Sequence, residues 1–288
     1  MLADTRKSRL ARFQVQSITG LRVLKASSLA HCVRRRWEHL LAPAVVAVFF
    51  VIWDLVVRVG GYPAFILPPP GRVWSRFLVV LSDGTLWRHT QATLLEIAAG
   101  LALGMSVATV LGYGLAKSRV LERLLSPYVV ASQSVPVVAI APLLIIWFGS
   151  GALSKVLICA LVVFFPALVN TIVGLRSVDE DLMALMRSLQ ATRWQIFTML
   201  EVPAALPVLL GGLKVGVTLA VVGAVVGEFV GADQGLGFLI NLARGTFDTP
   251  LLFVALFTLV AIAVSLYLTV GLMEQRLLAW RGDAKLSR

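Results

Sequence analysis

The chain has 288 residues, of which 58% are hydrophobic and only 14% are charged, and its mean hydropathy is +0.88. This is more apolar surface than one soluble core can bury, so the composition predicts an integral membrane protein. The formal net charge is +11, but most basic residues lie in connectors between apolar runs. They do not form one folded basic face, which argues against a nucleic-acid partner.

Cysteine and histidine usage gives no sign of a metal or redox site. Cys32 lies in a basic segment and Cys159 in an apolar run, so they are too few and too differently placed for a disulfide framework or a metal cluster. The three histidines are His31, His39 and His89, and their spacing is unlike that of metal ligands. We therefore expect neither a metal nor a cofactor on this chain.

Residues 1–38 form a basic arm in which Asp4 and Glu38 are the only acids. The arm has no apolar core of the kind that a cleavable secretory signal needs. Its acid-poor composition, with serine and arginine, also fits an organellar transit peptide. We favour a cytoplasmic arm that lies on anionic lipid, with the arginines at 34–36 at the inner end of the first span.

Six apolar runs are long enough to cross a bilayer as helices, which takes about 20 residues. The expected spans are residues 40–57, 93–115, 128–148, 156–175, 208–230 and 251–272. Between the first two, Gly61, Pro63 and the prolines at 68–70 disfavour helix. We expect an extended segment there, followed by a short interfacial helix.

The distribution of Lys and Arg predicts the orientation of these spans. With the N-terminus inside, the inner connectors hold 19 basic residues and the outer connectors hold 6. Because basic residues favour the cytoplasmic side, both termini are expected in the cytoplasm. The sequence thus predicts an all-α integral membrane protein with a basic arm (1–38), a six-helix transmembrane domain (39–280) and a cytoplasmic tail (281–288).

Small residues recur at helical spacing in the second and fifth spans. They are Gly100, Gly104, Ala108, Gly112 and Ala116, and then Gly212, Gly216, Ala220, Gly223, Gly227 and Gly231. Such stripes let helix backbones approach closely, either within one subunit or at a subunit or gate interface. Pro136 and Pro142 in the third span and Pro166 in the fourth each remove a backbone hydrogen bond, so we expect kinks there.

Few ionisable residues lie at membrane depth. Asp54 and Glu96 are near the outer ends of the first two spans, where their side chains can reach the interface. Glu228 is flanked by small residues and should face protein or water. Two interpretations of Glu228 stay open: it lines a pathway or an outer gate, or it pairs structurally with a residue such as Arg244.

Three stretches resemble permease subunits of ABC importers of the nitrate, sulfonate and taurine type. They are SQSVPVVAIAPLLIIWFG (132–149), FFPALVNTIVGLRSVD (164–179) and VPAALPVLLGGLKVGVTLAVVGAVVGEFVGADQGLGFLI (202–240). The resemblance covers about residues 40–280. It implies a type I importer permease in the cell inner membrane, with a second permease copy, two ATPase subunits that bind ATP and magnesium, and an extracytoplasmic substrate-binding protein. It also implies that Gln133, Pro136 and Glu228 lie along the translocation path.

That family carries an inner loop written as Glu-Ala-Ala, three residues, Gly, nine residues, Ile, any residue, Leu-Pro. Here the spacing is kept in segment 178–207, but Ala184 replaces the family's Glu and Gln190 its Gly. The resemblance implies an ATPase-coupling loop made of Ala184, Leu185, Met186, Arg187, Ser188, Leu189, Gln190, Ala191, Thr192, Trp194 and Pro203.

The loop is expected to form two short helices, the second ending at Pro203. Between them, Gln190 either bears the strain of a left-handed turn or lets the hinge become continuous helix. Met186, Leu189 and Trp194 are apolar on a cytoplasmic segment, which is typical of a partner site. They either enter a groove of the ATPase or dock on the permease's own helix ends.

The sequence predicts a transporter and not an enzyme. It has no G-x-x-x-x-G-K-[ST] phosphate loop and no nucleophile with a base at supporting spacing, so ATP hydrolysis is expected on a separate chain. Two other classes are alternatives. A secondary transporter would need ion-coupling residues at the membrane midplane and often has inverted repeats. A membrane enzyme would need a cluster of catalytic residues at one depth. Residues 220–250 resemble permeases for riboflavin or thiamine-precursor pyrimidine, with sulfonate, taurine or nitrate as alternative solutes.

Overall fold

A computed structural model describes residues 43–280 of the chain, and every regular element in that range is helical. The chain divides into two units, one up to Pro63 and one from Ala64 onward. The first contains the helix Pro43–Gly60, on which Asp54 and Arg58 form an ion pair of 2.6 Å one turn apart. The predicted arm (1–38) and tail (281–288) lie outside the described residues, as does Cys32.

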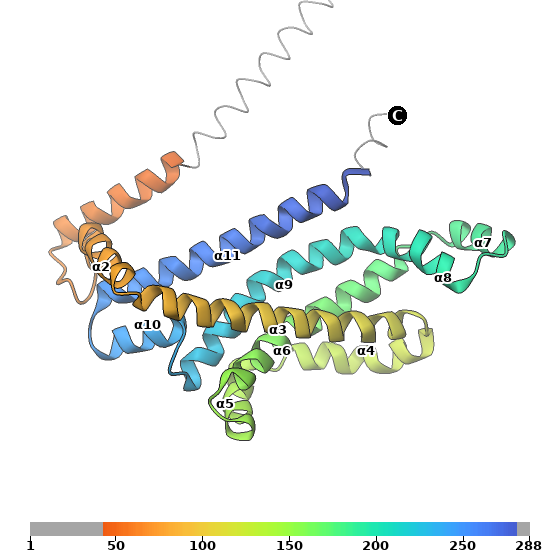
Figure 1. Cartoon of the computed structure of the whole chain (residues 1–288), viewed down its shortest axis with the longest axis horizontal. Helices are drawn as coiled ribbons and strands as arrows, with labels where there is room; N and C mark the ends of the chain where they lie inside the picture. The colour runs from red at the N-terminus through yellow and green to blue at the C-terminus, as the bar shows by residue number, and fades with distance from the viewer. Residues whose placement is uncertain (1–42, 281–288) are drawn as a thin grey trace, which may run out of the picture. The chain divides into compact units, whose positions relative to one another are not determined.

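The second unit contains the remaining helices of the described residues (Figure 1). In chain order they are α2 (Pro70–Ser82), α3 (Thr85–Ala116), α4 (Arg119–Gln133), α5 (Val137–Phe148), α6 (Ala152–Arg176), α7 (Glu180–Ser188), α8 (Arg193–Ile196), the π-helical turn η1 (Phe197–Glu201), α9 (Val202–Gly231), α10 (Leu236–Gly245) and α11 (Thr249–Leu277).

Five helices in the described residues are long and apolar enough to cross a membrane: Pro43–Gly60, Thr85–Ala116, Ala152–Arg176, Arg193–Gly231 and Thr249–Leu277. They coincide with five of the six predicted spans. The short helix predicted before the second span is also confirmed, because α2 begins at Pro70, where a missing N–H is tolerated.

The third predicted span, 128–148, is wrong as one continuous helix. Helix α4 ends at Gln133 and α5 begins at Val137, with Pro136 in an extended conformation between them. Proline lacks the N–H that would continue the helix and disfavours helix at the residue before it, so the chain breaks where we expected only a kink. Helix α5 has 12 residues, about 18 Å, which is shorter than the hydrocarbon core.

Helix α6 packs between α3 and α9 and forms the core of this unit. The small-residue stripes make this packing possible. A Cβ atom on Gly104 of α3 would lie 2.6 Å from the Ala160 carbonyl oxygen, and one on Gly223 of α9 would lie 2.8 Å from Cys159 Cα. Of the two interpretations of the stripes, packing within one subunit therefore accounts for these positions.

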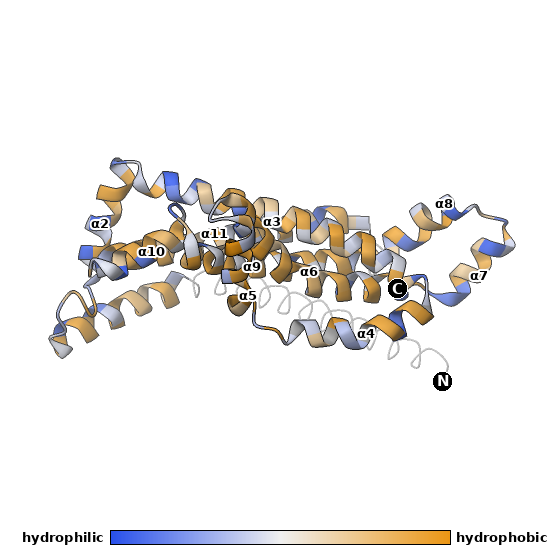
Figure 2. Ribbon diagram, turned by 90° about the horizontal axis from the view of Figure 1, so that it is seen from below, coloured by the Kyte–Doolittle hydropathy of each residue, from blue (hydrophilic) through white to orange (hydrophobic). Residues whose placement is uncertain are grey.

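The two ends of this unit differ in character. Helices α7 and α8 lie at one end, here called the loop end, and α10 and α2 lie at the other, here called the α10 end (Figure 1). Hydrophobic side chains follow the long helices between the two ends, whereas hydrophilic residues concentrate in α7 and the turns (Figure 2). The predicted orientation puts the loop end in the cytoplasm.

Candidate functional site

The candidate coupling loop is built from two separately capped helices, as the sequence predicts. The Asp179 carboxylate accepts a hydrogen bond of 2.9 Å from the Asp181 N–H at the start of α7. At the start of α8, Thr192 and Gln195 form a reciprocal capping box, with bonds of 2.8 and 3.3 Å. These caps satisfy N–H groups that a helix start leaves unbonded, so local sequence alone specifies both helices.

Gln190 adopts the left-handed turn, with φ of +56°. The Ala191 N–H bonds to the Met186 carbonyl and the Gln190 N–H bonds to the Arg187 carbonyl, each at 3.0 Å. This is the pair of hydrogen bonds that closes a helix in a Schellman motif, where glycine is the usual residue. Of the two outcomes left open, the strained turn is the one found, and the hinge is not continuous helix.

The predicted helix stop at Pro203 is wrong. The chain passes from α8 through η1 directly into α9, which starts at Val202. The Val202 N–H donates to the carbonyl of Phe197, five residues back. Pro203 is the second residue of α9, directly after the π-helical turn, and the wider bond spacing of that turn accommodates a residue that has no N–H.

Apolar side chains of the loop project away from the rest of the chain. Leu185, Leu189 and Trp194 are 53%, 68% and 71% exposed, and we call these three the loop patch. Met186 is half-buried. Docking on the permease's own helix ends, the second interpretation of Met186, Leu189 and Trp194, therefore does not describe Leu189 and Trp194.

Sequence reasoning missed the root of this loop, where η1 meets α3. Glu201 is 3% exposed and forms an ion pair with Lys117, which caps the end of α3. The Tyr113 hydroxyl lies 3.5 Å from the second oxygen of Glu201. In sequence, the only sign of this contact is a lone acid just before an apolar run, two residues ahead of Pro203.

The break between α4 and α5 opens a cavity of about 510 Å³. Its lining residues are Ser132, Val135, Pro136, Val137, Ile140, Leu161, Val162, Phe165, Pro166 and Leu219. This places Pro136, one of the predicted path residues, on a cavity wall. The side chain of Gln133, another of them, lies outside the described part of the structure. Ser132 supplies the one polar side chain among these ten residues, and none of the ten is charged.

Glu228, the third predicted path residue, is 1% exposed and is absent from the lining of that cavity. Its carboxylate accepts a hydrogen bond of 2.6 Å from the Thr93 hydroxyl and another from the Gly237 N–H. The proposed pairing with Arg244 is wrong, because Thr93 and Gly237 are the partners. A role on the translocation path stays a prediction.

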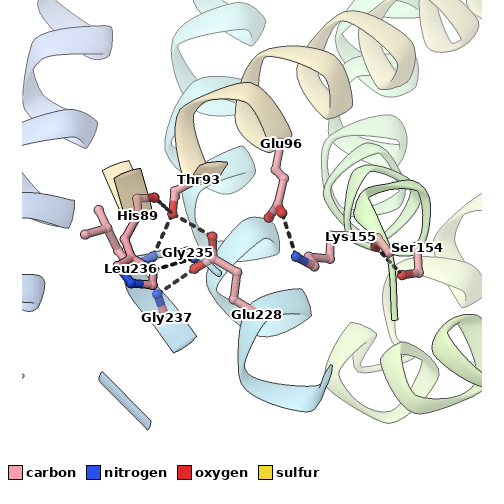
Figure 3. Close-up of polar contacts among 10 residues, drawn as sticks. His89, Thr93, Glu96, Ser154, Lys155, Glu228, Gly235, Leu236 and Gly237 are labelled. Atoms are coloured by element: carbon pink, nitrogen blue, oxygen red, sulfur yellow. Dashed lines mark hydrogen bonds and ion pairs between the residues drawn. The ribbon is translucent and has the colours of Figure 1, made fainter. Parts of the chain in front are cut away.

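The start of α10 is held by three side chains from other helices (Figure 3). The Gly235 N–H donates to His89 Nδ1 at 3.0 Å, the Leu236 N–H donates to Thr93 Oγ1 at 2.8 Å, and the Gly237 N–H donates to Glu228. Three successive N–H groups that a helix start leaves unbonded are thus satisfied by α3 and α9.

Glu96 does not reach the interface, contrary to our expectation. Its side chain and that of Lys155 are each 5% exposed, and the two form an ion pair of 2.9 Å between α3 and α6 (Figure 3). The predicted topology counts Lys155 among the six basic residues of the outer connectors, whereas the structure places it in the first turn of α6. Asp54 fits the expectation better, since its side chain is partly exposed beside Arg58.

Residues 100–279 match a family model described as the binding-protein-dependent transport system inner membrane component. The chain belongs to this family. It is 49% identical over 250 residues to the riboflavin transport system permease protein RibX of Chloroflexus aurantiacus, and the match covers 87% of this chain and 93% of that protein. It is 36% identical over 249 residues to the formylaminopyrimidine transport permease protein ThiX of Halalkalibacterium halodurans, and the match covers 86% of this chain and 99% of that protein.

More distant relatives agree on the class. The permease is 29% identical to the taurine transport system permease protein TauC of Escherichia coli over 266 residues, 88% of this chain and 97% of that one. An inward-facing structure of the MetNI methionine ABC transporter matches with a TM-score of 0.61 at 19% identity, over 68% of this chain and 97% of that chain. At this identity the structural match shows the fold alone. The chain is an inner-membrane permease of an ABC importer.

The family match includes the loop, the cavity and Glu228 but begins after His89, Thr93 and Glu96. The α3 half of the polar contacts around α10 therefore comes from a part of the permease that the family model does not cover. The role of His89, Thr93 and Glu96 therefore rests on the hydrogen bonds and the ion pair that they form.

Proposed function

We propose that this permease forms the translocation path for a neutral, vitamin-type heterocycle, riboflavin or a thiamine-precursor pyrimidine. The observation that carries the proposal is the lining of the cavity at the α4–α5 break, whose ten described residues include one hydroxyl and no charged side chain. The relatives named for riboflavin and formylaminopyrimidine transport, at 49% and 36% identity, support the same class of solute.

The chemistry of the lining discriminates between the two candidate classes. A sulfonate, taurine or nitrate ion entering this cavity would lose hydration of its anionic group without gaining a cationic partner from these ten residues. A neutral ring system loses less, and the face of Phe165 offers an aromatic surface for stacking. A sulfonate importer is the second candidate, supported by the aliphatic sulfonates permease SsuC of Bacillus subtilis at 32% identity.

The loop patch is the proposed contact with the ATPase. Leu185, Leu189 and Trp194 expose apolar surface on the loop, and such a surface is typical of a partner site. Two ATPase subunits, which bind ATP and magnesium, would press on this loop in each of two permease copies. A binding protein would deliver solute at the α10 end, and both termini of the permease would lie in the cytoplasm. Closure of the ATPases would then reorient the helices around the cavity.

The solute is tested with the cognate binding protein and the assembled transporter. We expect riboflavin or a hydroxymethyl- or formylamino-pyrimidine to bind the binding protein and to enter proteoliposomes in an ATP-dependent manner. Phe165→Ala should lower uptake several-fold without changing binding to the binding protein. Val173→Ala, on the exposed face of the same helix, is the matched control. Uptake of taurine or a sulfonate in place of these heterocycles would contradict the proposal.

The ATPase contact is tested by removing apolar side chains from the loop. Trp194→Ala combined with Met186→Asp should abolish co-purification of the ATPase. Trp74→Ala on α2 is the control, because Trp74 is also largely exposed, at 62%, but lies at the α10 end. If the loop variant retains the ATPase and couples its hydrolysis to transport, the loop is not the contact.

A further inference from the structure

The root of the coupling loop is fixed to α3 by a buried charge. Glu201 is the last residue of η1 and is 3% exposed. Its partner Lys117 is the C-cap residue of α3, and the Lys117 side chain is about half-exposed. Burying a carboxylate is costly unless it is paired and hydrogen-bonded. Lys117 and the Tyr113 hydroxyl provide those partners, so the register of η1 against α3 is specified by charge as well as by packing.

Aromatic rings extend this contact to the loop surface. The Trp194 ring lies 5.6 Å from the Phe197 ring, and the Phe197 ring meets the Tyr113 ring edge-on at 5.4 Å. The Lys117 ammonium lies 5.1 Å from the centre of the Tyr113 ring. Such pairs prefer these geometries and distances. A continuous path of contacts thus runs from exposed Trp194 to the end of α3.

The π-helical turn places both contact residues on the same side. Phe197 and Glu201 are four residues apart, and both meet α3 at Tyr113 or Lys117. The extra residue in the turn is bridged by the bond from the Val202 N–H to the Phe197 carbonyl. Single π turns occur often at functional sites, and removing one residue would rotate everything before it by about 100° about the helix axis.

Helix α3 leads from this contact to the α10 end. It has 32 residues, about 48 Å of helix. At its far end His89 and Thr93 hold the start of α10, and Glu96 binds Lys155 of α6. A rigid helix with specific polar contacts at both ends can carry a displacement from one end of the permease to the other.

We propose that Glu201 and Lys117, supported by Tyr113 and Phe197, are positioning residues that make the loop root and α3 move as one body. Displacement of the loop by the ATPase then reaches the α10 end through α3, in addition to the direct continuation of the loop into α9. This inference rests on the proposed function, in which the loop receives the movement of the ATPase.

The test measures whether the loop root and α3 keep their separation during the ATPase cycle. Spin labels at Gly114→Cys on α3 and Met199→Cys on η1 occupy an open and a largely exposed position; the native cysteines are replaced by serine or alanine. In the assembled transporter, the label distance should be the same without nucleotide and after trapping with magnesium, ATP and vanadate. With Lys117→Met and Glu201→Gln added, trapping should change or broaden that distance by several ångströms.

Function is measured on the same proteins. The double variant should hydrolyse ATP with the ATPase still bound, while solute moved per ATP falls at least five-fold. Lys117→Arg keeps the cation and should behave as the unchanged protein. If the pair were merely structural, removing either charge would lower the thermal midpoint, but trapping would leave the distance between the two labels unchanged in every variant.

The outcomes separate this inference from the proposed function. A label distance that changes on trapping in the unchanged transporter overturns the inference, as does a double variant in which trapping leaves the distance and the transport per ATP as before. If instead Trp194→Ala with Met186→Asp retains the ATPase, the proposed contact is wrong. The label distances still judge the inference in that case, because they are measured with the ATPase bound wherever it docks.

Discussion

The buried ion pair between Glu96 and Lys155 allows a quantitative test of how the α10 end is stabilised. The two side chains are 2.9 Å apart and each is 5% exposed, and the second Glu96 oxygen has no hydrogen-bond partner within the described residues. Removing one member of such a pair leaves an uncompensated buried charge, which costs about 3–5 kcal/mol. Replacing both by apolar side chains of similar volume is often close to neutral.

We therefore expect Lys155→Met and Glu96→Met each to destabilise the permease by about 3–5 kcal/mol, and the double replacement to cost far less than their sum. At about 2–4 °C per kcal/mol for domains of 150–250 residues, each single change lowers the thermal midpoint by roughly 10 °C. The midpoint is measured in detergent by the reaction of buried Cys159 with a fluorescent maleimide, which reports unfolding of the α3–α6–α9 core. If the two single losses simply add in the double variant, the pair does not act as a unit and the reasoning fails.

Three further changes test other parts of the structure. Gly223→Ala places a Cβ 2.8 Å from Cys159 Cα and should cost about 1–3 kcal/mol, whereas Gly211→Ala on the same helix meets nothing within 4 Å and should be neutral or slightly stabilising in a thermal melt. Gln190→Gly removes the cost of a left-handed residue, so the free energy of opening the loop should rise by up to about 1 kcal/mol and amide exchange there should slow. Faster exchange would contradict the turn. Thr93→Val keeps the shape of the side chain but leaves a buried N–H unpaired. The free energy of opening the start of α10 should therefore fall by about 1–3 kcal/mol, and amide exchange there should become faster.

The features that sequence predicts well are those that depend on local pattern. Five apolar helices follow from run length, and the two loop helices follow from caps at Asp179 and Thr192. The left-handed turn at Gln190 was one of two outcomes that the spacing of the family loop left open. Each of these is set by residues within about one helical turn, so no knowledge of the tertiary structure is needed.

The features that sequence predicts poorly depend on what lies opposite a residue in space. Pro203 should have stopped a helix, yet one extra residue in η1 accommodates it. Glu96 was expected to reach the interface because it lies near the outer end of a span, whereas its partner Lys155 on α6 keeps it buried. Glu201 carried no predicted role, because its partner is 84 positions away on α3. Pairing across helices decides these cases, and a single sequence does not reveal it.

The distribution of polar contacts implies that the two ends of the permease differ in how easily they rearrange. At the α10 end, His89, Thr93 and Glu228 are all buried, so breaking their bonds leaves unsatisfied groups away from water. Toward the loop end, two ion pairs keep both members partly in solvent: Arg176 with Glu122, and Lys214 with Glu274. Because water and salt can replace a partner there, these pairs cost less to open. Movement driven by the ATPase should therefore be taken up by rearrangement at these two pairs, while the Glu201–Lys117 contact and the α10 end each stay assembled.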